Sequence, residues 1–457
     1  MEIREYLENN LEQFKAALER LVRIPSVSGE AEGQYPFGKS CGEVLDEFLK
    51  ICEENGFYTR NYDYFAGSAD LYESGEPCDG SVAELGILAH LDVVPVTEKD
   101  WSFPPFELTE QDGFLYGRGV TDDKGPLLAA LFAMKAVREC GYKLQKNVRL
   151  IAGCSEETGS EKDIEAYCER AKMPDMVFTP DADFPIITTE KGMMRFAFGG
   201  SFDCGKIVSI KGGTVVNAVP SEVTAIIDGE VKLSADGITS IYENGRTEIV
   251  CKGVSAHASM PRQGENAFTK LFAALAECDL PEVDKKLLSA LLQLFPHGET
   301  NGAALGLDCT DVSGTTTCVF SIIDFEGGKL SCKADMRFPV SLNKATVTEK
   351  FKAAAKKAGL EFVSATGSEP HTVDTEGEFV KTLLEVYNEV TGLPSWCKAI
   401  GGGTYVHGIE GGVAFGPEFE GEDNRIHGAD ERAKISSLLT SAEIYAKAII
   451  KLCGGNV

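Results

Sequence analysis

The stretch Gly86-Ile-Leu-Ala-His-Leu-Asp92 places an apolar run directly before a histidine and an aspartate. A short apolar run that ends in polar residues is typical of a buried strand that opens into a site at its carboxyl end. Alternate side chains of a strand point the same way, so His90 and Asp92 are predicted to act together. One interpretation is a carboxylate that orients a metal-binding imidazole. The alternative is a buried histidine that only hydrogen-bonds a nearby aspartate.

Around this strand, apolar strands alternate with amphipathic helices. Strands predicted at 148–153 and 176–179 also end in polar residues, and the helix predicted at 126–138 has Pro126 in its first turn. This alternation indicates an α/β fold with a mostly parallel sheet.

The pattern changes near Thr189, where short strands and Gly-rich turns begin to predominate. We therefore predict a large inserted α+β domain at 189–378. The α/β domain is expected to be discontinuous and to cover 1–188 and 379–457.

The composition favours a soluble globular protein and disfavours several kinds of partner. The chain has 457 residues, of which 43% are hydrophobic and 25% charged, which is typical of a soluble globular protein. A net charge of −27 disfavours nucleic acid and anionic membranes as partners, and no apolar run approaches the ~18 residues of a membrane span. The 14 cysteines form no C-x-x-C pair, which favours reduced thiols and a cytoplasmic location.

Acidic residues and histidine recur at the predicted strand ends. They are His90 with Asp92, Asp122, the adjacent pair Glu156 and Glu157, and Asp181. The carboxyl ends of strands in an open α/β sheet form the usual site, so these side chains are expected to converge. Histidine mixed with carboxylates suits Zn²⁺ or Mn²⁺. Two such ions ~3.5–4 Å apart need a shared carboxylate and about two further ligands each. The residues at the strand ends suffice only with a second histidine, for which His427 is the candidate.

The chain also carries a series of short words in a fixed order. It resembles the two-metal aminoacylase/carnosinase/dipeptidase family, and in particular the bacterial PepV-type dipeptidases of that family. The matching words lie at 89–95, 117–125, 155–159, 180–185, 190–192, 217–220, 256–261, 334–339, 401–405 and His427.

The resemblance implies a phosphorylase/hydrolase-like catalytic domain with a lid domain inserted in it. It also implies two divalent metal ions, with Zn²⁺ favoured and Mn²⁺ as the alternative. Asp122 would bridge the two ions. His90 and Asp181 would complete one metal site, and Glu157 and His427 the other.

The remaining catalytic roles follow from the same resemblance. Glu156 would be the base that activates the attacking water, Asp92 would support His90, and His257 of the inserted domain would stabilise the oxyanion. In the family the peptide bond after the bridging aspartate is cis. Asp122 could instead cap the following helix, although Asp123 is the better candidate for that role.

A further set resembles the family's binding site for the substrate's terminal carboxylate. A guanidinium fork and backbone N–H groups suit that acceptor. The set consists of Asn217, Arg337, Gly402, Gly403 and Thr404. Because Asn217 and Arg337 come from the inserted domain, closure around the substrate is expected, with hinges near 188–192 and 375–380.

The function that the resemblance implies is hydrolysis of small dipeptides with free termini, by a monomeric enzyme. The chain departs from the family at His407, two residues after the 401–405 word, where relatives often carry arginine. Because histidine and arginine bind a carboxylate differently, this departure leaves the range of substrates open. The alternatives are a deacylase or desuccinylase of N-acyl amino acids from the same family, and a non-catalytic amino-acid- or metal-binding protein.

Overall fold

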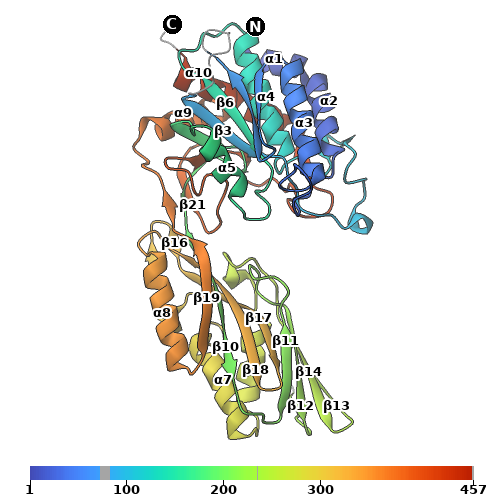
Figure 1. The fold of residues 1–457 in the computed structure, drawn as a ribbon, viewed down its shortest axis with the longest axis vertical. Coiled ribbons are helices and arrows are strands. Elements are labelled where there is room, and N and C mark those ends of the chain that lie inside the picture. Colours follow the sequence, from blue (N-terminus) through green and yellow to red (C-terminus); the bar gives the residue numbers. More distant parts are fainter. Residues whose placement is uncertain (73–82, 234, 455–457) are drawn as a thin grey trace. The chain divides into compact units, whose positions relative to one another are not determined.

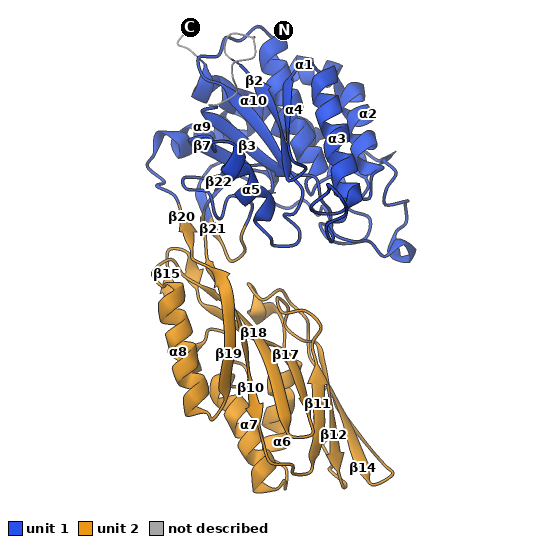
Figure 2. Cartoon of the chain, in the orientation of Figure 1, with its two compact units in different colours: residues 1–188, 373–398, 404–457 blue, residues 189–372, 399–403 orange. Residues whose placement is uncertain are grey.

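The computed structural model describes residues 1–72, 83–233 and 235–454 (Figure 1). The chain forms two compact units (Figure 2). Unit 1 consists of Met1–Thr188, Val373–Lys398 and Thr404–Val457, and unit 2 of Thr189–Thr372 and Ala399–Gly403. The chain thus returns to unit 1 at Val373 and not at the predicted residue 379, and it visits unit 2 once more at Ala399–Gly403.

A nine-stranded sheet, most of whose strands belong to unit 1, has the order β1-β2-β6-β3-β7-β22-β9-β20, and β21 pairs with β9. The pairs β6–β3, β3–β7 and β7–β22 are parallel, whereas β1–β2, β2–β6 and β22–β9 are antiparallel. This confirms the predicted α/β class with a parallel sheet at its centre. The strands of this sheet are β1 (Tyr58–Tyr62), β2 (Ala66–Leu71), β3 (Leu85–His90), β6 (Val148–Gly153), β7 (Met176–Thr179), β9 (Ile186–Glu190), β20 (His371–Thr372), β21 (Cys397–Ile400) and β22 (Val413–Ala414).

Smaller sheets of unit 1 join segments that are distant in the sequence. β8 pairs with β23, and β24 pairs with β5, which also pairs with β4. The latter sheet brings the segment after His427 beside the segment before Asp122. The strands are β4 (Thr109–Gln111), β5 (Phe114–Tyr116), β8 (Ala182–Asp183), β23 (Pro417–Glu418) and β24 (Arg432–Lys434).

The helices of unit 1 cover its sheet because their apolar faces match apolar strands. α4 and α10 both contact β3, and α3 and α5 both contact β1 and β2. Every residue of β3 and β6 is buried, as expected for central parallel strands covered on both faces. The helices are α1 (Ile3–Asn9), α2 (Leu11–Val22), α3 (Lys39–Glu54), α4 (Lys124–Glu139), α5 (Lys162–Arg170), α9 (Glu378–Thr391) and α10 (Ile435–Cys453).

Helix α4 shows why the core lies at this position. Pro126 stands in its first turn, where no intrahelical N–H is required. Leu127, Leu131 and Val137 are fully buried. Burial of each such side chain contributes about 1.5–3 kcal/mol. The helix is therefore held firmly, and the residues just before it, Asp122 and Asp123, have a fixed place.

Unit 2 contains an eight-stranded sheet with the order β13-β14-β12-β11-β17-β18-β10-β19, in which neighbouring strands are antiparallel. The strands are β10 (Gly192–Ser201), β11 (Ile207–Gly212), β12 (Glu222–Asp228), β13 (Ile238–Glu243), β14 (Arg246–Lys252), β17 (Thr317–Glu326), β18 (Lys329–Phe338) and β19 (Glu361–Ser368). A two-stranded hairpin, β15 (Thr310–Asp311) and β16 (Gly314–Thr315), lies outside this sheet.

Three helices accompany this sheet and share a second apolar core with it, in agreement with the predicted inserted α+β domain. α6 contacts β12 and β14, and α8 contacts β10 and β19. The helices are α6 (Ala267–Ala276), α7 (Glu282–Leu294) and α8 (Lys344–Lys357).

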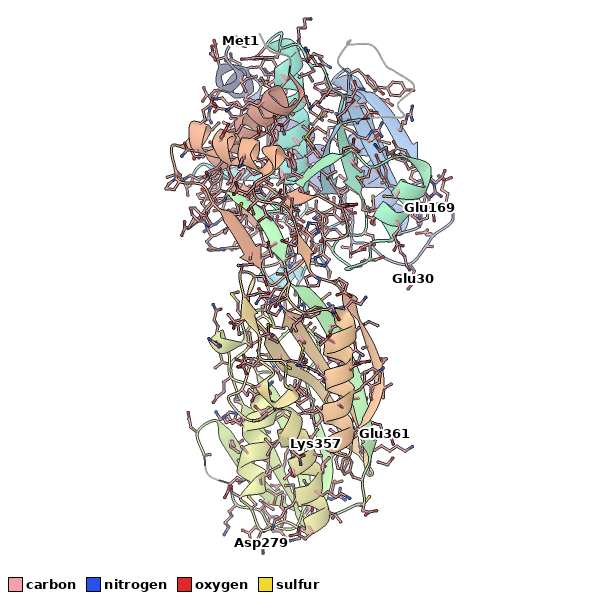
Figure 3. The ribbon with its side chains drawn as sticks, turned by 90° about the vertical axis from the view of Figure 1, so that its left-hand side faces the viewer. Met1, Glu30, Glu169, Asp279, Lys357 and Glu361 are labelled. Atoms are coloured by element: carbon pink, nitrogen blue, oxygen red, sulfur yellow. The ribbon has the colours of Figure 1, made fainter. Side chains whose placement is uncertain are left out.

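The surface carries many charged side chains, as the composition requires. Figure 3 labels Glu30, Glu169, Asp279, Lys357 and Glu361, all of which are exposed. Among the described residues, no helix combines the length and apolar character needed to span a bilayer. The cysteines in the described ranges are free thiols.

Candidate metal centre and active site

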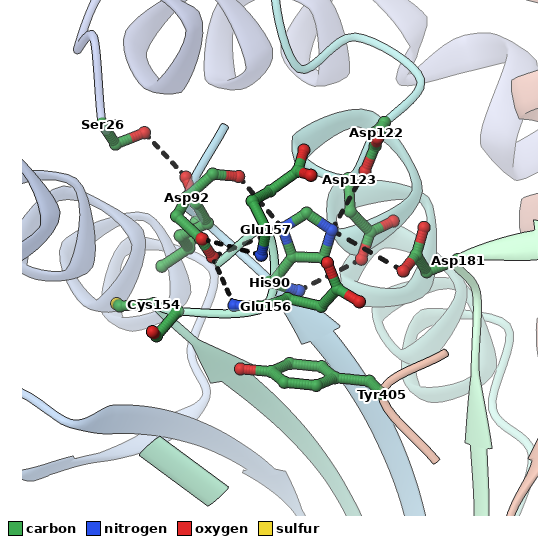
Figure 4. Close-up of polar contacts among 12 residues, drawn as sticks. Ser26, His90, Asp92, Asp122, Asp123, Cys154, Glu156, Glu157, Asp181 and Tyr405 are labelled. Atoms are coloured by element: carbon green, nitrogen blue, oxygen red, sulfur yellow. Dashed lines mark hydrogen bonds and ion pairs between the residues drawn. The ribbon is translucent and has the colours of Figure 1, made fainter. Parts of the chain in front are cut away.

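The first cluster of the site forms around His90 at the carboxyl end of β3. Its Nε2 atom lies 3.0 Å from Asp122 Oδ1 and 3.7 Å from Asp181 Oδ2. One potential ligand atom from each of these residues lies within 4.8 Å of the others. Figure 4 shows the carboxylates of Asp122 and Asp181 directed at the His90 ring. The three side chains could hold one metal ion.

The second cluster shares Asp122 with the first. His427 Nε2 lies 2.9 Å from Asp122 Oδ2 and 3.1 Å from Glu157 Oε2. Again one potential ligand atom from each residue lies within 4.8 Å of the others. The two oxygens of Asp122 thus face different histidines. This is the arrangement that a carboxylate needs to bridge two ions.

The sheet brings these side chains together from distant parts of the sequence. β3 and β6 run parallel, and His90 stands opposite Gly153, just before the segment that carries Glu157. Asp181 follows the end of β7, the other parallel neighbour of β3. Asp122 precedes α4, and the peptide bond that follows it is cis, as the resemblance led us to expect.

The hydrogen bonds of the two His90 ring nitrogens indicate that the first cluster could bind a cation. His90 is fully buried, and its Nδ1 contacts the main-chain oxygen of Asp92 at 3.0 Å, which requires a proton on Nδ1. In a neutral imidazole, the Nε2 lone pair would then face the carboxylate oxygens of Asp122 and Asp181. Among the described residues, Nε2 has no hydrogen-bond partner. A metal ion between these groups would satisfy all of them.

The charges within the cluster also favour a bound cation. Burial raises the pKa of Asp181 well above its usual value, and the charge of Asp122 adds to the shift. Burial also raises the pKa of Glu156 to about 8, an effect that the Glu157 and Asp122 carboxylates reinforce and His90 opposes. Like charges held in a poorly hydrated place favour either protons or a bound cation.

Glu156 differs from its neighbour Glu157 in what it touches. Glu157 contacts His427, whereas Glu156 belongs to neither of the two ligand clusters. A carboxylate beside a metal site that is not itself a ligand can accept and return a proton. The geometry is therefore compatible with the predicted division between a ligand and a base.

Asp92 contacts His90, as its predicted supporting role requires, and it also contacts the turn of the two glutamates. Its side-chain oxygens accept the N–H groups of Glu156 and Glu157, both at 3.1 Å. Its carboxylate lies 3.5 Å from His90 Nδ1, farther than its own main-chain oxygen does. Asp92 therefore supports the turn that carries the two glutamates with its carboxylate, and it contacts His90 mainly through its main-chain oxygen.

Asp123 stands at the N-cap position of α4 but its side chain makes no capping hydrogen bond. Its Oδ2 instead accepts the main-chain N–H of His90 at 3.1 Å. Asp122, the other candidate cap, faces the two histidines. The prediction that Asp123 caps the helix is therefore wrong for the side chain.

A buried pair that the sequence did not reveal lies beneath the glutamates. Asp163 accepts the N–H groups of Cys154 and Ser155, both at 2.9 Å, and the hydroxyl of Tyr405 donates to it. Gly153 makes this approach possible, because a Cβ there would lie 1.8 Å from the Tyr405 hydroxyl oxygen. Figure 4 shows Tyr405 beside the site. The 401–405 word had suggested only a role in binding substrate.

His427 has an unusual backbone. Its φ is +60°, a left-handed conformation that costs a residue with a side chain on the order of 1–3 kcal/mol. Arg425 and Asp430, in the same loop, also have positive φ. Contacts elsewhere in the loop must offset this cost if the histidine is to face Asp122.

Unit 2 brings together Asn217, which is predicted to bind the terminal carboxylate, and His257, which is predicted to stabilise the oxyanion. The main-chain oxygen of Asn217 accepts the N–H of Ala258 at 2.9 Å. His257 Nδ1 lies 2.6 Å from the Ser259 hydroxyl, which holds the ring in one orientation.

Arg337 lies at the end of β18 and is buried. It binds Asp335 through Nε and Nη2, at 2.7 and 3.2 Å, and donates from Nη1 to the oxygen of Gly401 at 3.1 Å. Ser259 lies against Gly401, where an added Cβ would come within 2.8 Å of it. The predicted residues of unit 2 therefore gather around the glycine word.

The glycine word itself is divided between the units. Gly402 and Gly403 belong to unit 2 and Thr404 to unit 1. The oxygen of Thr404 accepts the N–H of His407 at 2.9 Å, which places both in one turn. Roles in binding a terminal carboxylate stay predictions for all of these residues.

Comparisons with known proteins agree with this geometry. The model of Peptidase family M20/M25/M40 matches residues 86–451. The chain is 34% identical to the Beta-Ala-Xaa dipeptidase of Lactobacillus delbrueckii subsp. lactis, covering 95% of each protein. It is also 34% identical to YtjP of Bacillus subtilis (strain 168), provisionally named a dipeptidase, over 95% of this chain and 96% of that protein.

A solved structure shows the same fold at low identity. Human carnosine dipeptidase 1 matches with a TM-score of 0.60 and 16% identity, over 98% of both chains. Fold, family match and whole-length relatives agree, and the chain belongs to Peptidase family M20/M25/M40.

Proposed function

We propose that this protein is a metal-dependent dipeptidase that hydrolyses small dipeptides with free amino and carboxyl termini. The observation that carries the proposal is Asp122, whose two oxygens face His90 and His427 in two adjoining clusters of potential ligands. Glu156 stands beside them without joining either cluster. The dipeptidase name of a relative that is 34% identical over nearly its whole length supports the same reaction.

The chain would hold two divalent ions, one with His90 and Asp181 and the other with Glu157 and His427, with Asp122 shared between them. When bound, such ions polarise a substrate carbonyl and lower the pKa of a water molecule towards ~7. Zn²⁺ is the favoured ion on this mixture of imidazole and carboxylate, and Mn²⁺ is the alternative.

Glu156 would take the proton from the attacking water and return it to the leaving amine. A base of this kind works best when its pKa lies near the working pH. Burial raises the pKa of Glu156 to about 8, and bound cations would lower it again. Asp92 holds the turn that carries Glu156 by its main-chain N–H, so the carboxylate keeps its place while it gains and loses a proton.

The groups of unit 2 would complete substrate recognition. His257 would stabilise the oxyanion, and Asn217, Arg337 and the segment 402–404 would bind the terminal carboxylate. His257 is held by Ser259, and Arg337 by Asp335, so both side chains are oriented in advance. The PepV-type subgroup, a cytoplasmic location and a monomeric state are further predictions from the sequence.

The proposal is tested with the metal-loaded protein and a panel of substrates. Dipeptides, N-acetyl amino acids and N-succinyl amino acids are compared by release of free amino acid, after chelation and reloading with Zn²⁺ or Mn²⁺. We expect turnover of dipeptides and its loss in Glu156→Gln. Turnover confined to the N-acyl compounds would favour the deacylase alternative, and full activity of Glu156→Gln would refute the role of the base.

A further inference from the structure

A buried ion pair lies behind the candidate metal centre and contacts none of the substrate-binding residues named above. Arg118 Nη1 lies 2.7 Å from Glu431 Oε2, and the two side chains are 2% and 0% exposed. Burying two charges costs more than their attraction returns unless further hydrogen bonds satisfy them. The other hydrogen bonds of Arg118 and Glu431 therefore show what stabilises the pair in the interior.

The Glu431 carboxylate organises the segment that ends in Asp122. Its Oε2 accepts the N–H of Gly119 at 3.0 Å, and its Oε1 accepts those of Thr121 and Asp122 at 2.9 and 3.1 Å. Gly119 has φ of +90°, which the tight turn around the carboxylate requires. The main chain of the shared ligand is thus bound directly to Glu431.

Arg118, from the loop of Asp122, binds the main chain of the loop that carries His427. Its Nη2 donates to the main-chain oxygen of Gly428 at 3.0 Å, immediately after His427. The ring of Trp101 lies 5.2 Å from the guanidinium carbon and covers it. A side chain from each ligand-bearing loop therefore binds the main chain of the other loop.

Further bonds join the same two segments. The main-chain N–H of Gly117 donates to the oxygen of Glu431 at 3.1 Å, and the Thr121 hydroxyl donates to the oxygen of Arg432 at 2.9 Å. The ion pair is accordingly the charged centre of a continuous contact between the loop of Asp122 and the loop of His427.

We propose that Arg118 and Glu431 are positioning residues that couple Asp122 to His427, so that two metal ions bind as a pair. The proposal rests on the two-metal function proposed above. Asp122 alone belongs to both clusters, and its distance from His427 is set by the two loops that the ion pair joins. Loss of the pair leaves every ligand in the chain but lets one loop move against the other.

A second buried ion pair of unit 1 provides a matched control. Arg149 binds Asp70 through Nε and Nη2 at 2.6 and 3.2 Å, and both side chains are almost fully buried. Asp70 and Arg149 face each other in the register of β2 and β6 and belong to neither ligand cluster. Asp70→Asn should reduce stability in the way that any broken buried pair does, without altering the metal centre.

The test is calorimetric titration of Zn²⁺ into the chelator-treated full chain, with circular dichroism to verify folding. We expect wild type and Asp70→Asn to bind two equivalents with the same affinities. In Glu431→Gln the shape is kept but the charge is lost and an N–H₂ group faces N–H donors, so affinity should fall about 10–100-fold. Arg118→Lys keeps the charge without the fork and should show a smaller fall, and it replaces Glu431→Gln if that variant does not fold.

The outcomes separate this inference from the proposed function. If wild type bound fewer than two equivalents, the two-metal function would fail and this inference with it. If wild type bound two equivalents and both Glu431→Gln and Arg118→Lys matched it, the coupling would be refuted while the function stood. A fall of equal size in Asp70→Asn would reduce the role of Glu431 to general stability and would also refute the coupling.

Discussion

Replacement of Asp92 by Asn should disable catalysis while sparing the half of the metal centre formed by His90. The carboxylate of Asp92 accepts one N–H from Glu156 and one from Glu157, each at 3.1 Å. Asn keeps one acceptor oxygen and turns an N–H₂ group toward the other donor. The hydrogen bond of His90 Nδ1 is kept in Asp92→Asn, because its partner is the main-chain oxygen of residue 92.

The size of the effect follows from these contacts. A hydrogen bond to a charged group contributes about 1.5–3 kcal/mol, and a buried N–H left unpaired costs about 1–3 kcal/mol. The turn at 156–157 should therefore lose about 2.5–6 kcal/mol of the free energy that holds it. Since about 1.4 kcal/mol corresponds to a factor of ten, misplacement of Glu156 should lower kcat by about 100-fold or more.

The assay combines dipeptide turnover with Zn²⁺ titration of the chelator-treated protein. Asp92→Asn should keep tight binding of one equivalent, through His90 and Asp181, and bind the second more weakly because Glu157 has moved. Asp70→Asn serves as the control for loss of a buried carboxylate. Wild-type kcat in Asp92→Asn would refute the role of Asp92 in holding the glutamates, and loss of the tighter equivalent alone would show that Asp92 acts on His90 instead.

Three further predictions concern the same region. Glu156→Gln should lower kcat about 10²–10⁴-fold with an unchanged Zn²⁺ titration, since Glu156 lies outside both ligand clusters; weakened metal binding would contradict this. Burial raises the pKa of Asp163 to about 6, so the folded state holds more protons than the unfolded one between pH 4 and 6. Asp163 should contribute a fall of at most about 3 kcal/mol to the free energy of unfolding as pH rises through that window, measured in urea titrations, and the fall should be smaller by that amount in Asp163→Asn. Chelation should lower Tm, because a ligand at a hundred times its Kd stabilises the folded state by about 2.7 kcal/mol; an unchanged Tm would count against a metal centre.

The central part of the fold could be predicted from the sequence because parallel strands carry a strong signal. The apolar run before His90 and the strand at 148–153 are completely buried in the structure. The end of unit 2 was harder to predict. The chain crosses at Thr372 and again at Ala399–Gly403, and a short crossing segment rich in glycine has no periodic pattern that marks it.

Candidate ligands could also be predicted, because they follow strand ends whose direction the α/β pattern gives. His90 and Asp181 follow adjacent parallel strands, so their convergence is a property of the sheet. The partnership of Asp163 with Tyr405 could not be predicted in this way. It depends on Gly153, which has no side chain and so leaves room for the Tyr405 hydroxyl. No spacing in the sequence indicates which tyrosine fills that space.

Buried carboxylates around the centre fall into two groups that the sequence does not separate. Asp122 and Glu157 present oxygens to histidine Nε2 atoms. Asp92, Asp163 and Glu431 instead accept main-chain N–H groups. Both groups are acidic residues in loops beside apolar elements, so only their partners distinguish them.

This difference in partners predicts a difference in how the two groups respond to substitution. Removing Asp122 would take a ligand from both proposed metal ions, so the number of bound equivalents should change. Removing the charge of Asp92 or Glu431 leaves every ligand present but frees main-chain groups that fix its position, so affinity and kcat should fall by degrees at constant stoichiometry. The supporting carboxylates are therefore needed because a ligand loop must be held by something other than the metal before the metal binds.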